Sequence, residues 1–204
     1  TTLLLMEVAD WVAGQTGNQN RLSPIRVYSG KEDVDGRILI ERSSFQNNDP
    51  NQPPYITFAG DTSCQRINTE PGNFSLNIDV TDDHAVRIRL RQTQLQGELS
   101  VAAEGFNLAN GHIDGYLTKA SVLELLDDIR VICGGANPPD FCGLVALLLN
   151  SPDLIVNTFM GGYDAYVGPD GMIDGQCRVA PCNAVSVCLV VTSEGMKIDA
   201  LADD

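Results

Sequence analysis

The chain has 204 residues, of which 43% are hydrophobic and only 20% charged, a composition typical of a globular protein with a sizeable core and not of a disordered chain. Its 13 basic and 27 acidic residues give a formal net charge of −14, which disfavours nucleic acid and anionic membrane surfaces as partners. No apolar run approaches the about 20 residues that a membrane span needs, so we predict no transmembrane segment.

The first part of the chain, residues 1–117, is expected to be β-rich. Its short runs of β-branched and aromatic residues are separated by segments rich in Gly, Pro, Asn and Asp. Residues 86–90 alternate apolar side chains with Arg87 and Arg89, the pattern of an antiparallel strand with one face in water. The opening segment, residues 3–12, fits a helix or a strand, and we favour a strand. The strands expected after it are 25–29, 37–45, 55–60, 74–80, 85–91 and 95–103.

The hydrophobic period changes after Thr118, which we expect to be the N-cap of a helix. Five apolar residues then recur at helical spacing: Val122, Leu125, Leu126, Ile129 and Ile132. A second helical pattern begins at the proline pair 138–139, because proline is accepted in the first turn of a helix. Residues 118–150 therefore predict a helical hairpin. Residues 151–204 predict a loop, to 181, and then two closing strands.

The six cysteines predict three disulfides. None belongs to a Cys-x-x-Cys pair and the chain has only two histidines, so the spacing of a zinc site is missing. Local context pairs Cys133 with Cys142 and Cys177 with Cys182, which leaves Cys64–Cys188 as a long-range bridge. Three disulfides indicate an oxidising compartment, either extracellular or in the periplasm or outer envelope.

An acidic loop raises the question of a metal site. Its Asp-Gly-Met-Ile run at residues 170–173 resembles positions five to eight of an EF-hand, but Tyr, Gly and Cys would then stand where oxygen ligands are needed, so an EF-hand is rejected. A looser calcium site from Asp164, Asp170, Asp174 and backbone carbonyls is retained as an alternative. A plain β-turn at 168–171 is the competing interpretation.

Catalytic motifs are absent from the sequence. It contains no Gly-x-Ser-x-Gly elbow, no Gly-rich phosphate loop and no His-Glu-x-x-His helix. We therefore predict no catalytic and no cofactor-binding residue, and we expect a protein that is not an enzyme. A small envelope hydrolase that uses carboxylates or His112 is kept as a further alternative, although a surface turn is the expected place of His112.

Two segments together resemble uncharacterised secreted or lipid-anchored bacterial envelope proteins: residues 110–126, and the Asp/Gly-rich loop that leads into 183–191. The resemblance covers about the second half of the chain and implies a location outside the cytoplasm, with a lipid anchor upstream of Thr1.

The sequence as a whole predicts one α+β domain over 1–204, mainly antiparallel β and sandwich-like, with an inserted, disulfide-clamped helical hairpin. The expected function is that of a non-catalytic extracellular or envelope protein with a structural or interaction role. It would act through a protein partner or through self-association, for example as a subunit of a larger extracellular assembly.

Overall fold

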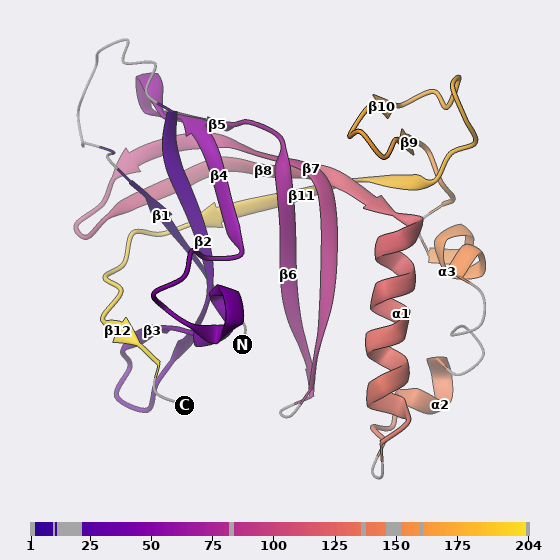
Figure 1. Ribbon diagram of the computed structural model, residues 1–204. Helices are drawn as coiled ribbons and strands as arrows, with labels where there is room; N and C mark the ends of the chain where they lie inside the picture. Colours follow the sequence, from indigo (N-terminus) through magenta and orange to yellow (C-terminus); the bar gives the residue numbers. More distant parts are fainter. Residues whose placement is uncertain are drawn as a thin grey trace. The chain divides into compact units, whose positions relative to one another are not determined.

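The computed structural model describes residues 3–9, 11, 22–81, 84–135, 138–145, 152–159 and 161–202. It is dominated by antiparallel β-sheet with a smaller helical part, which confirms the predicted α+β class (Figure 1). The strands of the large sheet are β1 (Leu3–Val8), β2 (Leu22–Glu32), β3 (Ile38–Ile40), β4 (Ile56–Asp61), β5 (Arg66–Thr69), β6 (Gly72–Thr81), β7 (His84–Val101), β8 (Phe106–Thr118), β11 (Ala184–Ser193) and β12 (Ala200–Leu201).

The sheet follows the order β11-β8-β7-β5-β4-β2-β3-β12, with β1 paired to β2 and β6 paired to β7. A separate hairpin is formed by β9 (Tyr166–Val167) and β10 (Ile173–Asp174). The helices are α1 (Lys119–Cys133), α2 (Cys142–Val145) and α3 (Pro152–Phe159).

The residues group into two compact units. The first comprises 1–72, 93–114 and 188–204, and the second comprises 73–92 and 115–187. The long strands β7, β8 and β11 contribute residues to both units. That the whole chain folds as one domain stays a prediction.

The core of the first unit explains why the opening segment forms a strand. In the antiparallel pair of β1 and β2, Leu5 lies opposite Tyr28, and both pack with Phe45 in a buried cluster. The Tyr28 hydroxyl donates to Glu7 at 2.6 Å, and Arg26 donates to the same carboxylate at 3.0 Å, so the polar tip of a buried ring is satisfied. Burial, followed by the bond to Glu7, raises the pKa of Tyr28. The predicted strand is confirmed over Leu3–Val8.

The helical part of the second unit begins as its sequence predicts. The Thr118 Oγ1 accepts from the Ser121 N–H at 3.1 Å, which confirms Thr118 as the N-cap of α1. Val122, Leu126 and Ile132 form its buried face. The disulfide Cys133–Cys142 then connects the end of α1 to α2.

The predicted loop after residue 150 is wrong in part, because it contains α3 and the β9–β10 hairpin. Val156 of α3 is fully buried and gives this short helix its packing contact. α3 lies beside α1 (Figure 1). For the second predicted helix of the hairpin, residues 146–150 lie outside the described residues, and α2 is its described part.

Candidate functional site

The strand β11 lies at the end of the sheet order, with β8 as its one strand neighbour among the described elements (yellow in Figure 1). Its ten residues, AVSVCLVVTS, contain no charged residue and no proline. An edge strand of this length and composition is unusual, because proteins normally protect sheet edges with charges, prolines or bulges.

Two contacts fix how β11 is paired with β8. The Lys119 N–H donates to the Asn183 carbonyl at 2.7 Å, and a Cβ placed on Gly111 would lie 2.5 Å from the Val191 carbonyl oxygen. The spacing from Gly111 to Lys119 equals that from Asn183 to Val191, so the antiparallel register is the same at both contacts. The odd-numbered residues of β11 therefore direct their backbone groups to β8, and the even-numbered ones direct theirs to the opposite side.

Among the described residues, the outward side of β11 has hydrogen-bond partners at its beginning. Ala184 exchanges backbone hydrogen bonds with Ala165, at 3.0 and 3.1 Å, and the Ser186 N–H donates to Asp164 Oδ1 at 2.7 Å. Beyond Ser186, the outward groups belong to three residues: Cys188, Val190 and Thr192. In the part of the chain that the structure describes, no neighbouring strand pairs with them.

The side chains on this stretch of β11 alternate between exposed and half-buried. Val190 is 74% exposed, a large value for a valine in the middle of a strand. The free edge, defined here as residues 188–192 of β11, thus combines backbone groups, to which no described strand is paired, with an exposed apolar side chain. It can accept an extended peptide segment as an additional strand.

The unpaired thiol of Cys188 corrects one predicted disulfide. The bridges Cys133–Cys142 and Cys177–Cys182 are confirmed, but Cys64 and Cys188 are free and exposed. Cys64 lies just before β5, and in the sheet order β5 is three strand spacings from β11. That separation is about 14 Å, whereas bridged residues need Cα atoms within about 7 Å.

Cys188 lies in a polar group with two residues of β8. Its Sγ is 4.0 Å from His112 Nδ1, and the register set by the two contacts above places Asp114 opposite it. The thiol's hydrogen bond to the Asp114 carboxylate raises the pKa of Cys188. A thiol that is kept protonated is a poor nucleophile, so Cys188 is not an activated thiolate here. The hydrolase alternative, which uses carboxylates or His112, stays a prediction of the sequence alone. His112 lies within a strand and not in the surface turn that we expected.

The three predicted calcium ligands are not brought together. Asp164 accepts from the backbone and hydroxyl of Ser186, and Asp170 accepts from the Met172 N–H at 3.0 Å within its own turn. Among the described residues, no group of three or more His, Cys, Asp or Glu side chains could hold a metal. Binding of calcium at this loop stays a prediction of the sequence alone.

Asp174 is the buried member of that set and has a structural role. Its carboxylate accepts from the N–H groups of Gln176, Arg178 and Val179 at 3.0, 2.6 and 3.0 Å. These backbone hydrogen bonds, with that of Gln176 foremost, hold the pKa of Asp174 below its usual value. The carboxylate thus fixes the start of the loop that the Cys177–Cys182 disulfide closes.

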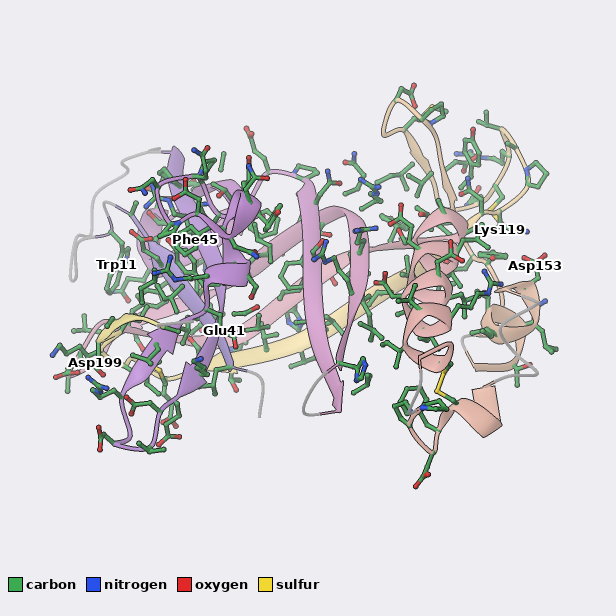
Figure 2. The ribbon with its side chains drawn as sticks, turned by 60° about the horizontal axis from the view of Figure 1, so that its bottom comes forward. Trp11, Glu41, Phe45, Lys119, Asp153 and Asp199 are labelled. Carbon is green, nitrogen blue, oxygen red and sulfur yellow. A yellow bond between two sulfur atoms is a disulfide. The ribbon has the colours of Figure 1, made fainter. Side chains whose placement is uncertain are left out.

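A second polar cluster connects α1 with α3 (Figure 2). Lys119 Nζ lies 2.7 Å from Asp153, and the Tyr163 hydroxyl donates to the same carboxylate at 3.2 Å. The Lys119 hydrogen bond lowers the pKa of Asp153, and burial, followed by the bond to Asp153, raises that of Tyr163 to about 12. The Asp153 carboxylate thus pairs with both Lys119 and Tyr163, and the cluster holds α1 and α3 together.

No family model, curated protein or solved structure matches the chain. None of the helices in the described part of the chain is long and apolar enough to cross a membrane. The free edge was not singled out from the sequence, although the absence of charge from residue 184 to residue 193 is its visible signal.

Proposed function

We propose that the chain is a non-catalytic interaction or structural protein of an oxidising compartment, extracellular or in the cell envelope, and that it binds an extended protein segment by strand addition to the free edge of β11. The observation that carries the proposal is the row of outward backbone groups at Cys188, Val190 and Thr192. In strand addition, main-chain hydrogen bonds supply the affinity and the side chains supply the selectivity.

The two disulfides support the compartment. Both close short loops in the second unit, between residues separated by 9 and 5 positions. Disulfides of this kind persist outside the reducing cytosol. The resemblance to secreted and lipid-anchored envelope proteins agrees with the same compartment.

The experiment uses a labelled, N-acetylated peptide of alternating threonine and valine residues as the probe, and follows its binding by fluorescence anisotropy. Val190→Pro removes the outward N–H of Val190. It leaves the β8 ladder intact, because proline is tolerated on the solvent side of an edge strand. Val190→Thr is the matched control, since it changes the side chain and keeps the donor.

We expect the wild type and Val190→Thr to bind the peptide and Val190→Pro to bind it about tenfold more weakly. Circular dichroism and the melting temperature check that all three are folded. Equal binding by the proline variant, or no binding by the wild type, would overturn strand addition at this edge.

A further inference from the structure

We infer that the segment added to β11 is the β11 strand of a second copy of this chain, paired antiparallel about a two-fold axis at Val190. The inference rests on the proposed function and names its partner. It follows from the limits of the free edge, from its charge and from the exposure of Val190.

The free edge is bounded on both sides, which fixes the register. At its start, the Ser186 N–H is already bound by Asp164. At its end, the chain leaves the strand after Ser193, and the Gly195 N–H donates to Asn107 Oδ1 at 2.8 Å. Only residues 188, 190 and 192 offer outward groups between these limits.

A two-fold axis at Val190 uses all of these groups. It pairs Val190 with Val190 of the second copy, and Cys188 with Thr192 of the second copy, in both directions. Each facing pair exchanges two backbone hydrogen bonds, so the arrangement forms about six. An axis two residues earlier would oppose Val190 to the occupied Ser186, and an axis two residues later would leave Cys188 opposite the departing chain.

Charge limits where two copies of this chain could meet. The chain carries −14, so two copies repel each other over most of their surface. β11 is uncharged along its whole length, so the edges can meet without opposing carboxylates within the strand. The exposed Val190 side chains become cross-strand neighbours, which contributes packing to the hydrogen bonds.

The register also predicts that the native thiols do not form a bridge. Cys188 and Cys188 of the second copy would lie four residues apart along the paired strands, which is about 14 Å. That exceeds the reach of a disulfide. A cysteine at position 190, in contrast, would face its own copy at about 5.5 Å between Cα atoms, a distance that suits a disulfide.

The first test is sedimentation of the full chain from about 20 µM to about 1 mM, the range for an interface of this small size. We expect a monomer–dimer equilibrium, strengthened as salt rises from about 20 to about 500 mM because repulsion is screened. Val190→Pro is expected to weaken the dimer at least about tenfold. A monomer throughout, or growth beyond the dimer, would overturn the two-fold pairing.

The second test traps the register. In a Cys64→Ser/Cys188→Ser background, Val190→Cys is oxidised by oxidised glutathione, which takes up the two electrons and two protons of the thiol pair as it is reduced. We expect a covalent dimer linked through residue 190. The matched control is Val131→Cys in the same background, because Val131 lies on α1 and is 78% exposed, close to the 74% of Val190. Equal cross-linking by both variants, or none at 190, would overturn the inference.

The two proposals fail separately. In one outcome, the wild type binds the peptide and Val190→Pro loses that binding, while the chain stays monomeric at every concentration. That result would support strand addition and would exclude a second copy as the partner. If the wild type neither binds the peptide nor dimerises, both strand addition and the second copy as its partner are overturned.

Discussion

Replacing Gly111 by alanine tests the close approach of β8 and β11, on which the orientation of the free edge depends. The added Cβ would lie 2.5 Å from the Val191 carbonyl oxygen, 2.8 Å from Val191 Cγ2 and 2.9 Å from Leu108 Cδ2. The nearest atom belongs to the backbone, so a side-chain rotation cannot relieve the overlap and β11 itself must move.

Overpacking of this kind costs about 1–3 kcal/mol, and we expect the upper half of that range because the strand has to shift. In a protein of this size, each kcal/mol lowers the melting temperature by about 2–4 °C, so Gly111→Ala should lower it by about 4–12 °C. Guanidinium unfolding followed by circular dichroism, with the disulfides intact, gives the free energy directly.

The control is Gly143→Ala in α2, where an added Cβ meets no atom within 4 Å. It should cost nothing and can stabilise by up to about 1 kcal/mol, because alanine has the higher helix propensity. If Gly111→Ala stays within about 0.5 kcal/mol of the wild type, β11 does not approach β8 as described, and the assignment of its outward residues is lost.

Three further predictions concern titratable groups. Tyr28→Phe should lower the free energy of unfolding by about 1.5–3 kcal/mol, because it removes a hydrogen bond to the charged Glu7. Since the pKa of Tyr28 is raised, the stability that this bond contributes is fully present below about pH 10 and is lost as the pH rises through the folded-state pKa. Thermal melts at alkaline pH measure this loss. Asp174 has a lowered pKa, so the stability that its carboxylate contributes is present above about pH 4 and is lost as the pH falls through the folded-state pKa. Asp174→Asn should therefore reduce the fall of the melting temperature at acidic pH. An unchanged fall would contradict the role of Asp174. Asp114→Asn should speed the alkylation of Cys188 by iodoacetamide at pH 8, because it removes the carboxylate that raises the thiol's pKa. Mass spectrometry of the Cys188 peptide gives the rate. A slower reaction would refute the contact between Cys188 and Asp114.

The elements that sequence patterns predicted are those fixed by local chemistry. The alternation of β-branched residues gave most strands, the helical period and the Thr118 cap gave α1, and the two short loops gave their disulfides. The helix α3 was missed although a proline and an acidic residue, Pro152 and Asp153, stand in its first turn, a recognised start signal. The helix has only eight residues, which is too few for the helical repeat of apolar residues to stand out in the sequence.

The features that failed depend on which strand neighbours which. Two strands were predicted where β7 runs continuously from His84 to Val101, because Gln92, with a φ of 50°, interrupts the alternation without ending the strand. The Cys64–Cys188 bridge was inferred by elimination, and no local signal reveals that β8 and β7 lie between the two residues. The free edge belongs to the same class: lack of charge in β11 is visible in the sequence, whereas its position at the end of the sheet is not.

The most direct test of the account is residue-resolved amide exchange on the same protein at low and high concentration. Leu189 and Val191, which face β8, should be protected at both concentrations. Cys188, Val190 and Thr192 should exchange rapidly in the dilute protein and become protected when it is concentrated. Protection of these three amides in the dilute monomer would contradict the account, because the edge would then be covered within the chain.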